Sequence, residues 1–172
     1  MHWIWSIIAA IASPWVYVRR ARSELVIYLT FDDGPHPQQT PLLLDMLKAH
    51  QAKASFFLLG KAAQEHPELV RRIAEEGHVL GNHSMTHQDP WKLTRAAQMA
   101  EIDEADAVLK RFDGQDKHLF RPPRGHASWT SIVKCALQRR YLALWNFDSH
   151  DYKLAAPELR QRLEQYQPRG GD

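Results

Sequence analysis

Thr30-Phe31-Asp32-Asp33-Gly34-Pro35 is the stretch of this chain that says most about its fold. It continues the apolar run Leu25–Leu29, whose branched and aromatic residues predict a buried strand. Two adjacent carboxylates therefore stand where a strand ends and a Gly-Pro turn begins. Because neighbouring carboxylates repel each other, keeping both of them ionised normally requires a cation beside them. The stretch predicts a strand that delivers a charged site at its carboxyl end.

Segments typical of strands and of helices alternate along the rest of the chain. The expected strands are Leu25–Phe31, Ala54–Leu59, Val79–Leu80, Leu119–Arg121 and Tyr141–Phe147. The expected helices are Pro41–His50, Pro67–Glu76, Thr94–Phe112, Ser128–Arg139 and Pro157–Gln165. This alternation predicts an α/β fold around a mostly parallel sheet, which is either open or closed into a barrel.

Polar side chains follow the expected strands at the point where each strand ends. In chain order they are Asp32 and Asp33, His83 and His87, Arg121 and Arg124, and Asp148 and Asp151. The carboxyl ends of parallel strands share one face of an α/β fold, and active sites are built on that face. We therefore expect these residues, which are far apart in the sequence, to converge in space.

His83 and His87 predict a metal site. Their spacing of four residues would place both imidazoles on one face of a helical turn, within reach of one ion at the ~2.0–2.1 Å typical of zinc. One aspartate of the doublet completes a two-histidine, one-carboxylate set with open positions, which is typical of catalytic centres, and the other can act as a base. The expected ion is zinc, with cobalt or another divalent ion as alternatives. Five other histidines lack partners at ligand spacing and are expected in turns or on the surface: His36, His66, His78, His118 and His126.

Length and charge narrow the class of protein. A chain of 172 residues is long enough for one domain with a sizeable core. The formal net charge of +2, with the basic residues dispersed, gives no sign of nucleic-acid binding. The single cysteine, Cys135, excludes an internal disulfide, and its amphipathic surroundings predict a small core residue.

The first 22 residues predict a hydrophobic membrane segment with a basic flank, ahead of a domain that covers residues 23–172. The run from Trp3 to Val18 is apolar except for two serines and a proline, and three arginines follow it. It is slightly shorter than the about 20 residues of a spanning helix. A cleaved signal peptide and a helix packed on the domain are the alternatives. The positive-inside rule places the domain in the cytoplasm.

Four segments of the chain resemble the first four motifs of the polysaccharide deacetylase family, which is carbohydrate esterase family four. They are Thr30–Pro35, His83–His87, Arg121–Gly125 and Trp145–Tyr152, and the similarity runs from about Leu25 to the C-terminus. The resemblance implies a distorted (β/α) barrel and a hydrolase that removes N-acetyl, or sometimes O-acetyl, groups from N-acetylated sugars. The location usual for the family is the cell envelope, in contrast to the cytoplasmic placement above.

The resemblance also implies roles for individual residues. Asp33, His83 and His87 match the family's metal ligands, Asp32 matches its catalytic base, and Arg121 matches the arginine that orients the base. A backbone N–H near Pro123 and Arg124 would stabilise the oxyanion of the transition state. Arg124 replaces a common aromatic residue and either contacts an anionic part of the substrate or is solvated, and Tyr152 replaces a tryptophan of the substrate pocket.

The fifth motif of the family has no match in this sequence. That motif is a strand ending in a Leu-x-His-Asp-like sequence, whose histidine protonates the leaving amine, whereas this chain ends at Pro168-Arg169-Gly170-Gly171-Asp172. Asp151, or with less support Asp148, would pair with that histidine in the family. We therefore expect a barrel that lacks its last strand and a chain of low stability and impaired activity.

Three other functions compete with the deacetylase. A non-catalytic, metal-containing carbohydrate-binding module at a membrane would carry the same metal ligands without turnover. A cytoplasmic amidohydrolase acting on small N-acyl compounds also fits the residues. A metal-dependent peptidase is disfavoured, since the sequence has no His-Glu-x-x-His helix.

Overall fold

The computed structural model describes residues 16–17 and 26–169 of the chain. Its strands are β1 (Val16–Tyr17), β2 (Thr30–Gly34), β3 (Ser55–Leu58), β4 (Val79–Asn82), β5 (Leu119–Phe120) and β6 (Leu142–Ala143). Its α-helices are α2 (Gln39–Ala49), α3 (Gly60–Glu65), α4 (Pro67–Glu75), α5 (Arg95–Asp113), α6 (Trp129–Leu137) and α7 (Ala156–Gln165). Two short 3-10 turns are η1 (Pro90–Lys92) and η2 (Pro123–Gly125).

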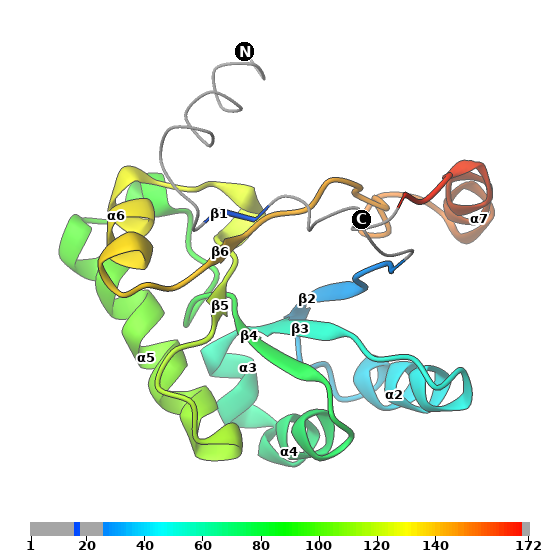
Figure 1. Cartoon of the computed structure of the whole chain (residues 1–172), viewed down its shortest axis with the longest axis horizontal. Helices are drawn as coiled ribbons and strands as arrows, with labels where there is room; N and C mark the ends of the chain where they lie inside the picture. Colours follow the sequence, from blue (N-terminus) through cyan, green and yellow to red (C-terminus); the bar gives the residue numbers. More distant parts are fainter. Residues whose placement is uncertain (1–15, 18–25, 170–172) are drawn as a thin grey trace.

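The strands form one sheet in the order β1-β6-β5-β4-β3-β2, and every pairing is parallel. The sheet curls into a half-barrel, with α2, α4, α3, α5 and α6 arranged around its outside (Figure 1). Within the described residues β1 and β2 are its two edges. The predicted α/β fold with a parallel, barrel-like sheet is confirmed.

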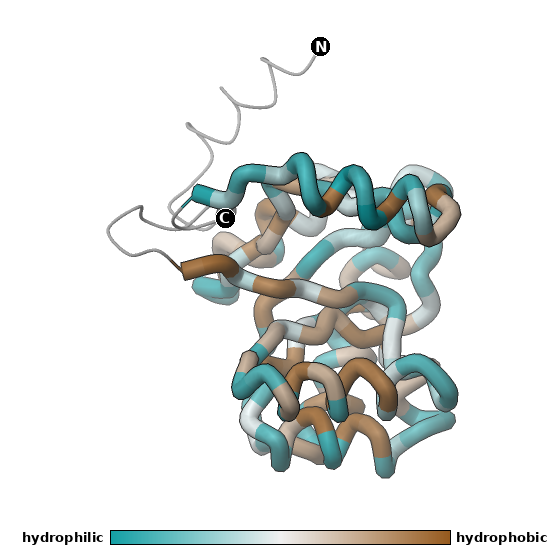
Figure 2. Tube along the Cα trace, turned by 90° about the vertical axis from the view of Figure 1, so that its right-hand side faces the viewer, coloured by the Kyte–Doolittle hydropathy of each residue, from teal (hydrophilic) through white to brown (hydrophobic). Residues whose placement is uncertain are grey.

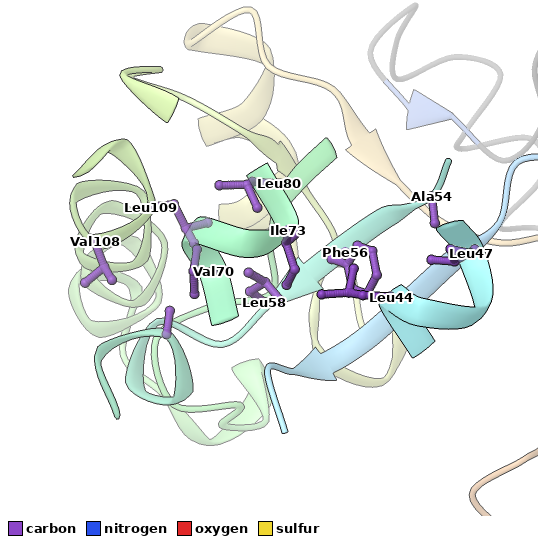
Figure 3. Close-up of a cluster of buried hydrophobic side chains, with 11 residues drawn as sticks. Leu44, Leu47, Ala54, Phe56, Leu58, Val70, Ile73, Leu80, Val108 and Leu109 are labelled. Atoms are coloured by element: carbon purple, nitrogen blue, oxygen red, sulfur yellow. The ribbon is translucent and has the colours of Figure 1, made fainter. Parts of the chain in front are cut away.

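The main core lies between β3, β4 and the helices α2, α4 and α5. Figure 3 shows Phe56 and Leu58 of β3 packed among side chains of these helices, and Leu44, Leu58, Val70 and Ile73 are fully buried. Burying a side chain of this size contributes roughly 1.5–3 kcal/mol to the free energy of unfolding. This packing fixes β3 and β4, and thereby the strand ends that carry the candidate site.

A second core cluster joins α5 and α6 to β5 and β6, and Cys135 is part of it. Burial raises the pKa of the Cys135 thiol to about 11, so the residue is a small core side chain, as the sequence predicts. By contrast, α7 has no buried residue and is mostly hydrophilic (Figure 2). The apolar interior is therefore concentrated around the middle of the sheet.

Two predicted strands are shorter or later than expected. The first begins at Thr30 instead of Leu25, and its partner β3 begins opposite it at Ser55, so Val26–Leu29 lie outside the paired region and are exposed. The last covers only Leu142–Ala143 of the predicted Tyr141–Phe147, since it pairs with the two-residue strand β5. In both cases the paired region is only as long as the neighbouring strand allows, although the apolar run in the sequence is longer.

The predicted membrane segment lies mostly outside the described residues, with one exception. Val16 and Tyr17, inside the predicted 1–22 segment, form β1 and pair with Leu142 and Ala143 of β6. No helix among the described residues is long and apolar enough to cross a membrane.

Candidate metal centre and active site

A β-bulge at the end of β2 brings both carboxylates of the aspartate doublet to one side. Asp32 is opposite Phe57 of β3 and Gly34 is opposite Leu58, so Asp33 is an extra residue with a positive φ of 67°. Successive side chains of a regular strand point to opposite faces, and a bulge re-aims them. As a result Asp33 Oδ1 lies 3.3 Å and Asp32 Oδ2 lies 4.0 Å from the same atom, Nε2 of His83.

His83 and His87 lie in a loop after β4, and the predicted helical turn is wrong. The segment between them is irregular, and Ser84 and His87 have positive φ values of 72° and 58°. Two hydrogen bonds hold it: the backbone N–H of Ser84 donates to Asn82 Oδ1 at 2.9 Å, and that of His87 donates to Ser84 Oγ at 3.0 Å. This backbone, instead of helical periodicity, brings the second imidazole to Asp33, with His87 Nε2 3.2 Å from Asp33 Oδ1.

Asp33, His83 and His87 fit a divalent cation. One ligand atom from each lies within 4.8 Å of the other two. His83 Nδ1 is 2.8 Å from the backbone carbonyl of Arg121, which can only accept a hydrogen bond, so Nδ1 carries the proton and the lone pair of Nε2 faces Asp33. His83 is buried and His87 is half-buried, whereas Asp33 is 62% exposed, which leaves a side of the site open. This is the donor set expected from the sequence.

The charges of the three side chains support the same interpretation. When His83 is protonated, its Nε2–H donates to Asp33 and lowers the pKa of this carboxyl, against the effect of burial, and the positive charges of both histidines lower it further. Burial lowers the pKa of His87, and the charge of Asp33, which opposes this, does not outweigh it. An ionised carboxylate and neutral imidazoles are the forms that bind a metal ion.

Arg121 holds Asp32 next to this centre. Its Nη1 donates to Asp32 Oδ1 at 2.6 Å and to Thr30 Oγ1 at 2.8 Å, and Nη2 donates to the carbonyl of Leu144 at 3.2 Å. Burial lowers the pKa of Arg121 and the charge of Asp32 opposes this, and the guanidinium is packed 3.9 Å from the ring centre of Phe57. Asp32 is thus fixed as a carboxylate beside His83, but remains partly exposed.

Among the described residues, the side chains of Asp148, Asp151 and Tyr152 contact one another or their neighbours in the loop after β6 instead of the candidate metal ligands. Asp151 is exposed and accepts a hydrogen bond from Ser149 Oγ at 2.9 Å. Asp148 contacts His150 Nε2 at 3.3 Å and the Tyr152 hydroxyl at 3.4 Å. These residues lie just after the last strand, as the sequence predicts. In the loop after β6, Asp148 contacts His150 and Tyr152, and Asp151 contacts Ser149.

Pro123 and Arg124 lie in the turn η2, closer to the centre. We call residues 83–89, which follow β4 and carry His83 and His87, the histidine loop. Pro123 is buried and lines a small cavity together with Ser84 and Gln88 of this loop. Arg124 is exposed and lies 3.9 Å from Asp89 of the same loop. The effect of its charge on the pKa of His87 places it near the ligands.

The sequence prediction missed a buried polar cluster behind the histidine loop. Asp106, His118 and Arg140 are buried there together with Asn82, and His118 was wrongly expected in a turn or on the surface. His78 was also wrongly placed, since it is buried and its Nδ1 accepts a hydrogen bond from the backbone N–H of Ala54 at 3.2 Å. A signal was present: Asp106 is one helical turn after Ile102, on the apolar face of α5, where a charged residue requires a partner.

Comparison with known proteins identifies the group to which the chain is related. Residues 19–139 match the polysaccharide deacetylase family. The chain belongs to this family. A peptidoglycan-N-acetylglucosamine deacetylase of Bacillus cereus is 39% identical over 127 residues, which are 74% of this chain and 46% of that protein. This family member therefore spans less than half the length of that relative.

Solved structures support the assignment. The crystal structure of a peptidoglycan N-acetylglucosamine deacetylase superposes with a TM-score of 0.85 at 32% identity, covering 91% of this family member and 73% of that chain. A mutant of a family-four carbohydrate esterase pseudoenzyme with restored enzymatic activity superposes with a TM-score of 0.83 at 26% identity, covering 92% and 59%. The same fold thus occurs in a deacetylase and in a pseudoenzyme, so the side chains of the site must decide between them.

Proposed function

We propose that this protein is a metal-dependent hydrolase that removes N-acetyl, or O-acetyl, groups from N-acetylated sugars or their polymers. The observation that carries the proposal is the convergence of both carboxylates of the doublet on Nε2 of His83, with His87 on the other side of Asp33. One carboxylate can then bind a cation while the other, held by Arg121, stays available for proton transfer. Membership of the family and the similarity to a peptidoglycan deacetylase support the substrate class.

The residues of the site divide the reaction between them. Asp33, His83 and His87 would hold a divalent ion, for which zinc is our proposal, and this ion would supply a lowered pKa of bound water and polarisation of an acetyl carbonyl. Asp32 accepts the proton of the attacking water, and the hydrogen bond from Arg121 keeps that carboxylate aimed at the centre. A backbone N–H near Pro123 and Arg124 would stabilise the oxyanion, a contact worth about 3–4 kcal/mol in other enzymes.

Protonation of the leaving amine is the step of the reaction for which the described residues offer the fewest candidate groups. Asp151, expected to pair with a histidine acid, contacts the Ser149 hydroxyl instead. A general acid at this step typically contributes about 10²–10⁴ to the rate, so the acetate assay below also reports whether the described residues supply one.

Acetate release and metal content test the proposal together. The purified chain is loaded with zinc, dialysed, and assayed for bound zinc and for acetate released from chitooligosaccharides and from peptidoglycan fragments. We expect one zinc per chain and acetate release that Asp32→Asn reduces. Absence of bound zinc contradicts the metal-dependent function.

A carbohydrate-binding module is the second candidate function. It is supported by the similarity to a pseudoenzyme of the same family. Bound zinc and sugar binding, combined with acetate release that is equal in the wild type and in Asp32→Asn, would support the module. Binding of chitooligosaccharides by isothermal titration calorimetry, in parallel with the acetate assay, separates the two functions.

Arg124 is proposed to contact the substrate, since it is exposed and lies near His87. An arginine that contacts an anionic sugar lowers the KM for anionic peptidoglycan fragments but not for neutral chitooligosaccharides, whereas a solvated arginine affects neither. Comparing Arg124→Gln with the wild type on the two substrates distinguishes these roles. Tyr152→Phe tests in the same assay whether its hydroxyl contributes.

We further propose that the apolar N-terminal residues attach the protein to a membrane. The run from Trp3 to Val18 is apolar except for two serines and one proline and is slightly shorter than the about 20 residues of a spanning helix, which favours attachment at the interface. Attachment at the interface should be reversed by alkaline carbonate, whereas a spanning segment resists it. Retention in the membrane pellet after carbonate extraction contradicts interfacial attachment.

A further inference from the structure

Asp106 is a buried acid in the middle of α5 with three polar partners. Its Oδ1 accepts hydrogen bonds from Asn82 Nδ2 at 2.8 Å and from His118 Nδ1 at 3.0 Å, and its Oδ2 accepts one from Arg140 Nη2. His118 Nε2 also contacts Asp113 at 3.1 Å. None of these residues belongs to the metal centre, but Asn82 immediately precedes His83.

The charges of this cluster are balanced within the protein. Burial by itself raises the pKa of Asp106, but His118, Arg140 and Asn82 outweigh it and the pKa is lowered. Asp106 is therefore an ionised acceptor, and both of its oxygens already accept hydrogen bonds from the protein. Its effect on the rest of the molecule must pass through the groups that it binds.

Asn82 is the group that connects this cluster to the metal centre. Its side chain is completely buried, and Nδ2 donates both to Asp106 and to the backbone carbonyl of Ile102 at 2.9 Å. Both of these oxygens can only accept hydrogen bonds, so they fix which end of the amide is the nitrogen. The amide oxygen is thereby turned toward the histidine loop.

The orientation of Asn82 determines the backbone of that loop. Asn82 Oδ1 accepts the N–H of Ser84, which has a positive φ of 72°, and Ser84 Oγ in turn accepts the N–H of His87, whose φ is also positive. Non-glycine residues in this region are uncommon and need support from their surroundings. A flipped amide would oppose its NH₂ group to the N–H of Ser84 and remove that support.

We propose that Asp106 is a positioning residue for the two histidine ligands, acting through the fixed amide of Asn82 on the Ser84–His87 backbone. The inference rests on the proposed metal-dependent function and extends it to a residue on a different element. Groups that orient metal ligands typically contribute about 10–100-fold to metal affinity. Asp106 therefore affects metal binding without touching the metal or the substrate.

Two substitutions of Asp106 separate positioning from stability. Asp106→Leu removes the acceptor of Asn82 and should raise the zinc Kd about tenfold or more. Asp106→Asn can keep an oxygen toward Asn82 and places its NH₂ toward Arg140, so it should lose stability but keep the zinc Kd within about threefold of the wild type. Zinc affinity is measured by competition with a chromophoric chelator in the cold, on protein whose folded fraction is verified by circular dichroism.

Two control variants on α5 complete the design. Leu109→Ala leaves a cavity in the core, and Asp103→Asn removes the charge that pairs with Lys134 of α6. The side-chain hydrogen bonds of Asn82 go to Ile102, Asp106 and Ser84, and to neither of these residues. Both should keep the zinc Kd of the wild type. The visible spectrum of the cobalt-loaded protein should change in Asp106→Leu and stay unchanged in the two controls.

The outcomes distinguish this inference from the proposed function. Zinc binding by the wild type with an equal Kd in Asp106→Leu overturns the positioning role and leaves the metal centre intact. Equal weakening in Asp106→Leu and Leu109→Ala also overturns it, because loss of stability then explains the effect. If the wild type itself binds no zinc, the proposed function fails and the inference fails with it.

Discussion

The metal centre and the buried polar cluster behind it are built from the same residue types with opposite results. In the centre, Nε2 atoms of His83 and His87 both face one carboxylate oxygen of Asp33, on a side that is open to solvent. In the cluster, the carboxylate of Asp106 is enclosed and already paired with His118 and Arg140. One set leaves lone pairs for an external cation, and the other is neutralised by a cation of the protein.

The comparison shows that aspartate and histidine in proximity do not by themselves make a metal site. What decides is whether the electron pairs of the donor atoms are already engaged by protein hydrogens. The carbonyl of Arg121 places the proton of His83 on Nδ1 and leaves Nε2 available, whereas both ring nitrogens of His118 face carboxylates. Buried charges need such partners, since an unpaired charge is costly in the interior.

Removing a ligand of the centre should give the largest effect. His83→Ala deletes the buried imidazole, so zinc affinity should fall by more than about 100-fold, beyond the effect of groups that only orient ligands. Isothermal titration calorimetry with zinc measures this. His66→Ala, at a histidine that does not contact the centre, is the matched control and should bind zinc normally. Equal zinc affinity in His83→Ala and the wild type would contradict the assignment.

Removing the base should affect catalysis but not metal binding. Asp32→Asn can still accept a hydrogen bond from Arg121 but cannot take a proton, so kcat should fall by about 10²–10⁴. Zinc content should remain that of the wild type, which elemental analysis checks. A loss of bound zinc in this variant would make Asp32 a ligand instead of the base.

Breaking the buried cluster should affect stability most. Arg140→Met removes one of the two cationic partners of Asp106, and the free energy of unfolding should fall by about 3–5 kcal/mol. Arg139→Met, at the exposed neighbouring arginine, should change it by less than about 0.5 kcal/mol. Urea denaturation compares the two variants, and similar small effects would show that the pair contributes little.

The smallest effect is expected from pH. Burial lowers the pKa of His118, but hydrogen bonds with Asp106 and Asp113 outweigh it, and the pKa is raised above the usual 6.5. The protonated imidazole therefore stabilises the fold fully below pH about 6.5, and this contribution is lost as pH rises through the higher folded-state pKa. The stability difference between the wild type and His118→Gln, measured by urea denaturation with a chelator present, should decrease as pH rises from about 6.5 to about 9. A difference that grows with pH would contradict the sign of the shift.

Sequence reasoning was most successful where a residue type has few structural uses. The Asp-Asp doublet after an apolar run and the spaced histidines predicted three side chains that the structure brings together, Asp33, His83 and His87, and their location at the carboxyl ends of strands. Residue spacing gave no information on the contacts of Asp148, Asp151 and Tyr152 within their own loop, because these depend on backbone turns. Sequence reasoning also missed Asn82 and Asp106. The role of an amide or an acid on an otherwise apolar strand or helix can be inferred only when its hydrogen-bond partners are known.

The sequence by itself determined the alternating elements, the parallel sheet and which side chains are the candidate metal ligands. These follow from local periodicity and from the chemistry of carboxylate and imidazole. Only the tertiary structure decided how the side chains converge, through the bulge at Asp33 and the left-handed backbone of Ser84 and His87. The physical reason is that both conformations are unfavourable in an isolated chain and are held by hydrogen bonds and packing from distant elements.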